Sequence, residues 1–236
     1  MLRQTIYFIF VGRRQTGQIL EQLFAIGNRS VLFVTVTLGF LGLISIFQVA
    51  IQIQKVLPDY SMVGAAFLTV MIREFGPTIT GLMVATRTGS AIAAEIGSMV
   101  VTEQIDALRM SNADPINYLV VPRFIACGMM LVVLSVFAVL VATATGMIMG
   151  RQGFGIPYNT FLNLSLVKWQ DVVIGIMKSA AYGFAIPLIA AQAGLSAKGG
   201  SEGVGWATTR SVVNCSFAVI VLDFFISGFG YVVLSP

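Results

Sequence analysis

The sequence contains no histidine, only two cysteines and few charged residues. Without histidine, the chain cannot form a Ser-His or Cys-His nucleophile pair or an HExxH zinc motif. Cys127 and Cys215 lie in separate apolar stretches and form no CxxC spacing, which is typical of small buried side chains. We therefore predict no metal site, no disulfide framework and no catalysis by this chain.

The sequence gives no indication of two further classes of ligand, nucleotides and nucleic acids. The chain contains no GxxxxGK[ST] motif, so it cannot bind ATP through a phosphate-binding loop, and we expect it to bind no cofactor of its own. The net charge of +4 is too modest to indicate a nucleic-acid partner.

What the sequence does contain is apolar surface. Hydrophobic residues make up 57% of the 236 residues and charged residues 10%, against about 25% charged in a soluble domain. Mean hydropathy is +0.90. A soluble fold of this size could not hide so much apolar surface from water, whereas lipid removes that constraint. The composition predicts an all-α polytopic membrane protein.

Five stretches are long and apolar enough to span a bilayer, which requires about 20 residues. They cover residues 30–54, 62–101, 124–150, 171–195 and 211–234. Residues 1–28 contain no such run, and we predict an amphipathic helix or two lying in the membrane surface there. Lys55, Pro58 and Asp59 predict a turn after the first span. We expect a single domain over 1–236, with its bundle at 30–235.

The distribution of basic residues predicts the orientation. If the N-terminus is cytoplasmic, nine basic residues lie on that side and three on the other, in keeping with the positive-inside rule. The nine are Arg3, Arg13, Arg14, Arg29, Arg87, Arg109, Arg123, Lys198 and Arg210, and the three are Lys55, Arg151 and Lys168. We therefore predict a cytoplasmic N-terminus.

Four charged residues lie inside the predicted spans: Arg73, Glu74, Lys178 and Asp223. At ~1.5 Å per residue, Glu74 and Lys178 both lie roughly 10–18 Å below the outer surface, and Asp223 lies near the middle of the fifth span. The four are formally neutral together and can meet at one depth. Two interpretations are possible: the four residues form a structural ion pair that holds helices together, or they line a cavity that opens and closes or that contacts a polar headgroup. The adjacent Gly76-Pro77 predicts a locally broken or mobile helix.

Small residues recur every four positions at Gly89, Ala93 and Gly97, a pattern that allows another helix to approach closely. That neighbour is either another helix of this chain or a second subunit. Glu95, between them, lies where it can pair with Arg87.

The polar segment 102–117 connects the second and third spans on the predicted cytoplasmic side. Residues 103–110 predict a short helix with Ile105 and Leu108 on one face. Asp114-Pro115 predicts a helix start, with a capping carboxylate followed by proline at the first helical position. Such a helix is either a docking site for a soluble partner or an ordinary surface loop.

Four stretches resemble a known family. They are REFGPTITGLMVATRTGSAIAAEIGSMVVTEQIDAL at 73–108, DPINYLVVPR at 114–123, and GVGWATTRSVV with the later LDFF. In combination they resemble the MlaE (YrbE-like) permease family, from about residue 30 to the C-terminus. Asn112 stands where many relatives have glycine, and we expect the left-handed turn to survive because asparagine tolerates it.

The resemblance implies a single permease domain of an ABC transporter that works with MCE proteins and moves phospholipids, or in some branches sterols, between the bacterial inner membrane and the outer envelope. It implies a homodimer, a cytoplasmic ATPase that uses the ATP, an MCE-domain protein on the outer side and, in some systems, a STAS-domain protein. It assigns Arg73, Glu74, Lys178 and Asp223 to charged positions of the membrane core. It also makes the segment from Glu103 to Arg109 the coupling helix, comprising Glu103, Gln104, Ile105, Asp106, Leu108 and Arg109.

Two other functions fit the same residues. The chain is alternatively a scaffold that anchors an envelope complex without moving anything, or a secondary transporter driven by protons through Glu74 and Asp223.

Overall fold

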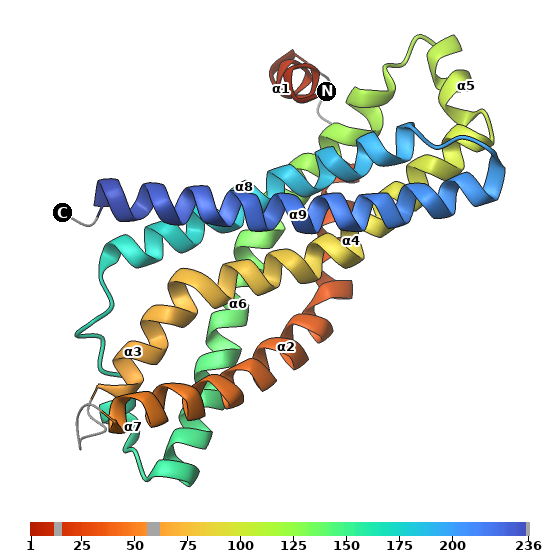
Figure 1. Ribbon diagram of the computed structural model, residues 1–236. Coiled ribbons are helices and arrows are strands. Elements are labelled where there is room, and N and C mark those ends of the chain that lie inside the picture. The colour runs from red at the N-terminus through yellow and green to blue at the C-terminus, as the bar shows by residue number, and fades with distance from the viewer. Residues whose placement is uncertain (12–15, 56–61, 235–236) are drawn as a thin grey trace.

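The computed structural model describes residues 1–11, 16–55 and 62–234, which form helices and connecting turns without a strand (Figure 1). Within these ranges five segments are long and apolar enough to cross a membrane, which confirms the predicted number. The first is α2 (Thr16–Gln54), and the second is α3 (Val63–Val70) continued by α4 (Gly76–Val101). The third is a short turn continued by α6 (Val121–Phe154), and the last two are α8 (Trp169–Leu195) and α9 (Gly200–Leu234).

The boundary drawn at residues 28–30 differs from the structure. Helix α1 (Leu2–Val11) is separate, but residues 16–28 belong to the same continuous helix as the first span. Arg29 interrupts the apolar run, yet a charged side chain does not end a helix, and no proline intervenes. At ~1.5 Å per residue α2 is roughly 58 Å long, so it extends well beyond a hydrocarbon core of about 30 Å. Arg13, Arg14 and the predicted turn at Pro58 and Asp59 lie outside the described residues.

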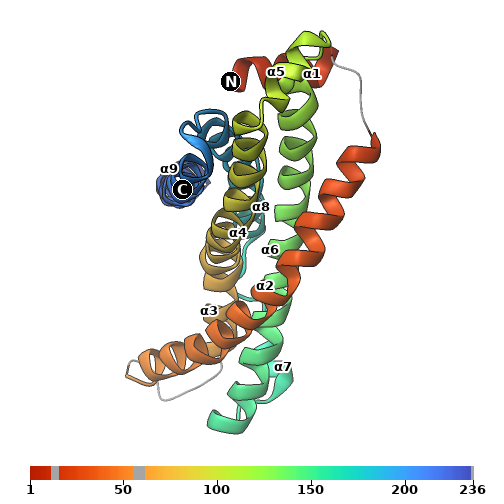
Figure 2. The same cartoon turned by 90° about the vertical axis from the view of Figure 1, so that its right-hand side faces the viewer.

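The spans pack side by side in a staggered row. Helix α2 packs mainly on α6, α6 on α8, and α4 lies against both α8 and α9. Turned by 90°, the molecule shows α9 along its axis at one edge and the start of α2 at the other (Figure 2). One core cluster lies between α4, α6, α8 and α9, and a second joins α2, α3, α6 and α7 (Tyr158–Phe161).

The bundle has two ends. Helix α1, helix α5 (Gln104–Met110) and the α8–α9 connection lie at one, the α5 end, while α7 and the end of α2 lie at the other, the α7 end (Figure 1). Helix α1 lies across the α5 end rather than along the spans (Figures 1 and 2). Its location in a membrane surface stays a prediction.

Two prolines near the starts of long helices are accommodated in the same way. Pro77 has no N–H, and the turn before it widens into a π-helical segment, η1 (Met71–Phe75), in which the Gly76 N–H bonds the Met71 carbonyl. The same widening, η2 (Ile116–Val120), precedes Pro122, with the Val121 N–H on the Ile116 carbonyl. A π-turn relieves the clash of a proline ring with the preceding turn.

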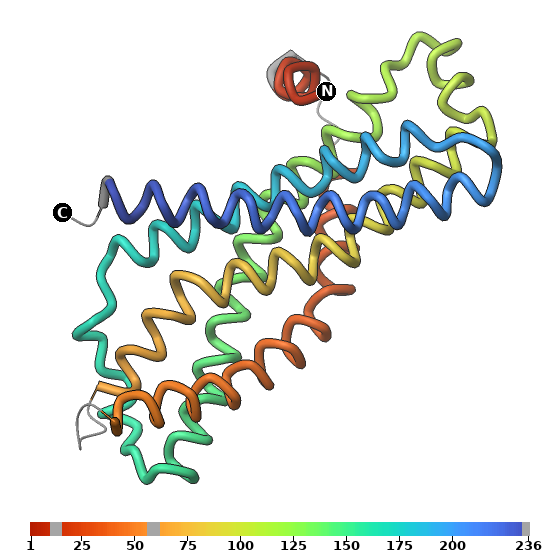
Figure 3. The backbone as a smooth tube through the Cα atoms, in the orientation of Figure 1, coloured from red at the N-terminus to blue at the C-terminus, as the bar shows by residue number. Residues whose placement is uncertain are grey.

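The helix predicted to break at Gly76-Pro77 therefore stays continuous. The backbone follows one path from residue 63 to residue 101 (Figure 3), and only its turn geometry changes at η1.

Small residues let the spans touch backbone to backbone. A Cβ added to Gly183 of α8 would lie 2.8 Å from the Gly128 Cα of α6 and 2.9 Å from the Cys127 carbonyl oxygen. The predicted small face of α4 packs within the chain: Gly89 lies against Ser211 and Cys215 of α9, and its carbonyl accepts a 2.9 Å hydrogen bond from the Ser211 hydroxyl.

The rest of that face also contacts helices of the same chain. A Cβ on Gly97 would meet the Ala197 Cβ at 3.4 Å, and one on Gly194 of α8 would lie 2.9 Å from the Ala93 carbonyl oxygen. Of the two readings for Gly89, Ala93 and Gly97, the structure therefore supports internal packing.

We predict that Gly183→Ala lowers the stability of the folded protein by about 1–3 kcal/mol, because its methyl group has no room at the α6–α8 crossing. Gly205→Ala is the matched control: it lies in α9 with nothing within 4 Å, so better helix propensity makes it neutral or stabilising by up to ~1 kcal/mol. Thermal unfolding in mild detergent measures both. Equal midpoints for the two variants would contradict the close crossing.

Candidate functional site

A buried lysine lies where three helical segments meet. The side chain of Lys178, in the middle of α8, is 0% exposed, and its ammonium group pairs with Glu74 of η1 and with Asp223 Oδ1 of α9, the latter at 2.9 Å. The two carboxylates are partly exposed, at 35% for Glu74 and 25% for Asp223. Three of the four intramembrane charges singled out in the sequence are therefore in direct contact.

Arg73 links this group to the first turn of α8. Its guanidinium lies 3.6 Å from Glu74 Oε1 and 3.4 Å from Asp171 Oδ1. Asp171 also accepts a 3.0 Å hydrogen bond from the Lys168 backbone N–H and so caps the start of α8. Arg73, Glu74, Asp171, Lys178 and Asp223 are called the charge cluster below. With Asp171 included, the cluster carries a formal charge of −1 rather than zero.

Hydroxyl groups complete the shell around the carboxylates. Asp223 Oδ1 accepts hydrogen bonds from the Tyr182 hydroxyl at 2.7 Å and the Thr78 hydroxyl at 2.9 Å. Glu74 accepts a longer bond, of 3.4 Å, from the Ser227 hydroxyl. Because charged acceptors strengthen such bonds, these groups offset part of the cost of removing the carboxylates from water.

Sequence reasoning missed these hydroxyl groups, although a signal was present. Each lies four residues after a charged member of the cluster on the same helical face: Thr78 after Glu74, Tyr182 after Lys178, and Ser227 after Asp223. Asp171 is not among the predicted site residues for a different reason, because the sequence marks it only as the first residue of a span.

An apolar hollow of about 170 Å³ lies beside the charge cluster. It is lined by Ile72 and Pro77 from the second span, Ser135 and Val139 from α6, and Gly175 from α8. The hollow and the cluster are built by the same two helical segments, since Ile72 precedes Arg73 and Val172 follows Asp171, although no member of the cluster lines the hollow itself. This pairing suits an amphipathic ligand better than a small ion.

At the α5 end, the short connecting helix has one buried and one exposed face. Ile105 is buried and Leu108 half-buried, which places the predicted apolar face inward. The polar residues Glu103, Gln104, Asp106 and Arg109 are exposed, and Arg109 pairs with Asp106 at 3.1 Å.

Two left-handed residues bracket α5. Glu103 has φ 60° and Asn112 has φ 58°, which confirms the turn expected at Asn112. After it, the Asp114 carboxylate accepts a 2.8 Å hydrogen bond from the Ile116 N–H, as predicted for a cap ahead of Pro115. Both ends of α5 are therefore defined by turns, which hold it as a distinct projection (Figure 1).

The pairing of Glu95 with Arg87 is wrong. Glu95 instead pairs with Arg123 of α6 at 2.8 Å, and Arg123 also donates to the Leu119 carbonyl at 2.9 Å. The Arg87 guanidinium lies over the Phe33 ring of α2, 4.8 Å from its centroid. Eight residues, or roughly 12 Å along α4, separate Glu95 from Arg87. Arg123 of α6, whose side chain is 9% exposed, lies within contact of Glu95 and has its buried charge offset there.

Known proteins resemble the chain over nearly its whole length. A family model described as permease MlaE matches residues 19–229. A probable ABC transporter permease protein of Synechocystis sp. is 38% identical over 95% of this chain and 86% of its own length. One of Rickettsia bellii is 34% identical over 96% of this chain and 85% of its own. The chloroplast protein trigalactosyldiacylglycerol 1 of Arabidopsis thaliana is 33% identical over 96% of this chain and 65% of its own length.

We predict that Lys178→Met destabilises the protein by about 3–5 kcal/mol, because it leaves two carboxylates without their buried cation. The triple variant Lys178→Met, Glu74→Gln, Asp223→Asn removes all three charges and should recover most of that loss. Chemical unfolding in detergent measures both, with Lys55→Met, at an exposed site, as the control. A single variant as stable as the parent would show that the ion pairs do not hold the helices together.

Proposed function

The chain belongs to the permease MlaE family, and from that premise we propose that it is the membrane subunit of an ABC transporter that moves phospholipid between a bacterial inner membrane and the outer envelope. A separate ATPase supplies the energy. The observation that carries this proposal is that one span holds two features. The second span contributes Glu74 to the charge cluster, and the exposed helix α5 follows at its end.

In this proposal the α5 end faces the cytoplasm. Arg3, Arg109, Lys198 and Arg210 belong to that end, whereas Lys55, Arg151 and Lys168 belong to the α7 end. The excess of basic residues supports that orientation by the positive-inside rule.

The proposed ATPase docks on α5. Its exposed polar face is free to enter a groove of a soluble partner, while Ile105 anchors it to the bundle. Helix α4 (Gly76–Val101) connects α5 to η1 over roughly 39 Å, at ~1.5 Å per residue. A displacement of α5 is therefore transmitted along one helix to the segment that carries Glu74.

The proposed substrate group is the phosphate of a phospholipid. In the structure, Lys178 is paired with two carboxylates and has no exposed surface that a further anion could contact. Withdrawal of η1 would remove Glu74 from Lys178, and a lipid phosphate could then replace it, with an acyl chain in the apolar hollow beside Ile72. The name of the Arabidopsis relative contains a glycolipid, which supports a lipid substrate.

The remaining partners in the proposal follow the family. A second copy of the chain would pack on the part of α9 that begins at Phe217, where the exposed side chains include Phe217, Phe224 and Phe225. An MCE-domain protein would receive lipid at the α7 end, and a STAS-domain protein would bind the ATPase. A scaffold without transport and a proton-driven carrier remain the competing functions.

Reconstitution separates the three. We expect the purified chain to bring down an ATPase and to move labelled phospholipid between proteoliposomes and an acceptor MCE protein only when ATP is hydrolysed. Transfer without ATP that collapses when a proton gradient is dissipated would identify a carrier. Full biological function in a Glu74→Gln, Lys178→Ala variant would instead indicate a scaffold.

We predict that Arg109→Glu lowers lipid transfer at least tenfold while ATP hydrolysis by the partner continues, because the reversed charge disrupts docking of an exposed helix without touching the core. Glu103→Lys should act in the same direction. Lys55→Glu, an exposed charge reversal at the α7 end, is the control and should transfer lipid normally. Normal transfer by both α5 variants would refute the coupling role.

A further inference from the structure

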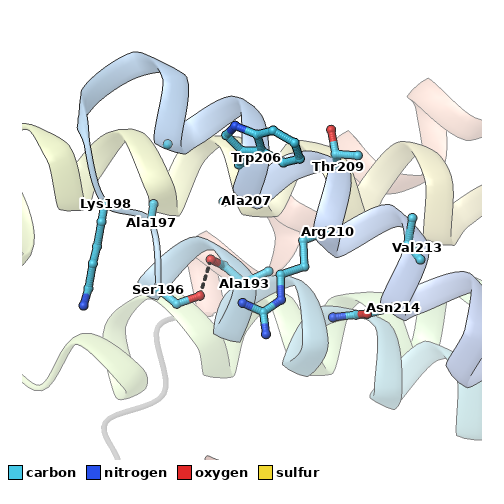
Figure 4. A pocket seen from close by; sticks show the side chains of 11 residues that line it. Ala193, Ser196, Ala197, Lys198, Trp206, Ala207, Thr209, Arg210, Val213 and Asn214 are labelled. Atoms are coloured by element: carbon cyan, nitrogen blue, oxygen red, sulfur yellow. Dashed lines mark hydrogen bonds between the residues drawn. The ribbon is translucent and has the colours of Figure 1, made fainter.

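A hollow of about 560 Å³ lies at the α5 end, between the end of α8, the connection to α9 and the first turns of α9 (Figure 4). This volume is within the range of roughly 300–1,000 Å³ typical of small-molecule sites. It lies about 18 residues, or roughly 27 Å, along α8 from Lys178, so it is distinct from the charge cluster.

Two cations line the hollow. Arg210 extends from α9 toward Ala193 and Ser196 at the end of α8, and Lys198 extends from the connecting loop (Figure 4). In this view the Ser196 hydroxyl, which donates a 2.8 Å hydrogen bond to the Ala193 carbonyl, lies between the two cationic groups. Both cations are exposed, and neither forms an ion pair with any residue that the structure describes. The hollow therefore carries an unbalanced positive charge.

The length of α9 gives the depth of the hollow. Beyond Arg210 the helix continues for about 24 residues, or roughly 36 Å, in which Asp223 of the charge cluster is the one charged side chain. This length is enough to cross a hydrocarbon core of about 30 Å. Arg210 and the exposed Trp206 thus stand at the boundary of that core, where tryptophan and snorkelling arginine side chains are favoured. The hollow opens at the level of lipid headgroups.

Its walls combine two kinds of surface. Lys198, Ser196 and Arg210 contribute polar groups, whereas Ala193, Trp206 and Val213 contribute apolar surface, with Val213 and Asn214 about one turn deeper along α9 than Arg210. A molecule with an anionic head and an apolar tail matches this mixed lining. Two cations exceed the single charge of a phosphodiester, so a headgroup that adds no ammonium group fits better than a zwitterionic one.

We propose that this hollow binds the phosphate headgroup of an anionic glycerophospholipid, such as phosphatidylglycerol, from the leaflet at the α5 end. The site goes beyond the proposed transport function, because it depends only on the spans and their depth. The lipid would bind there even in a chain that transports nothing.

The two tryptophans of the chain provide the test. Trp206 lines the hollow, and Trp169 begins α8 at the opposite end. Trp169→Phe leaves Trp206 as the only reporter, and Trp206→Phe leaves Trp169. Each is reconstituted in nanodiscs of phosphatidylcholine with increasing fractions of a lipid brominated near the top of its acyl chains, either phosphatidylglycerol or phosphatidylcholine.

Trp206 should be quenched at a lower mole fraction of brominated phosphatidylglycerol than of brominated phosphatidylcholine, by about fivefold for each cation. Trp169 should show no preference. In the Trp169→Phe background, Lys198→Gln with Arg210→Gln should abolish the preference, whereas Arg29→Gln, an exposed cation on α2, should leave it unchanged. Thermal unfolding midpoints should match the parent, because both substituted side chains are exposed.

Equal quenching of Trp206 by the two lipids would overturn the site, as would a preference that survives the double variant. Loss of the preference on adding millimolar glycerophosphate would assign the hollow to soluble phosphate instead. A preference that vanishes only when the ATPase is present would support the site and show that the partner competes for it. None of these measurements depends on lipid transfer, so the site and the proposed transport function fail separately.

Discussion

The buried ammonium group of Lys178 is the constraint that the rest of the bundle satisfies. A lysine with no exposed surface cannot stay charged inside a membrane unless anions lie within contact distance. Glu74 and Asp223 provide them from two other spans, so the second and fifth spans are tied to the level of Lys178 on α8. A slip of one residue would move either carboxylate by ~1.5 Å along the axis and about 100° around it. The contacts of the Lys178 side chain therefore fix the register of three helices.

The backbone geometry of η1 allows two adjacent residues to join the charge cluster. Arg73 and Glu74 are adjacent in sequence, yet both belong to the cluster, with Arg73 reaching Asp171 while Glu74 reaches Lys178. They lie within η1, the widened turn that precedes Pro77. A π-turn changes the direction of successive side chains compared with an α-helix, and such turns recur at functional sites. The proline thus contributes to the geometry of the cluster without breaking the span.

Much of this arrangement could be predicted from the sequence. The number of spans follows from apolar runs, and the meeting of the four charges follows from counting residues down each span, because helical rise converts position into depth. Depth alone does not give the direction in which a side chain points around its helix. For that reason the sequence does not distinguish Arg123 from Arg87 as the partner of Glu95. The boundary predicted within α2 has another cause, because the first span is counted only as far as its uncharged run and Arg29 interrupts that run. The hydroxyl partners Thr78, Tyr182 and Ser227 needed only the i, i+4 rule, applied once the charges were known.

The two ends of the second span contact the neighbouring helices in different ways. Near the α5 end its small residues, such as Gly89 and Ala93, hold α4 against α8 and α9 at backbone contact, where packing is close and resists sliding. At η1 the contacts are ionic, and the two carboxylates that pair with Lys178 are partly exposed. In the proposed transporter, a displacement of α5 would therefore move the tightly packed part of α4 as a unit, and the ion pairs at η1 would rearrange. This contrast follows from the kinds of residue at each end of one helix, and the coupling proposed for α5 depends on it.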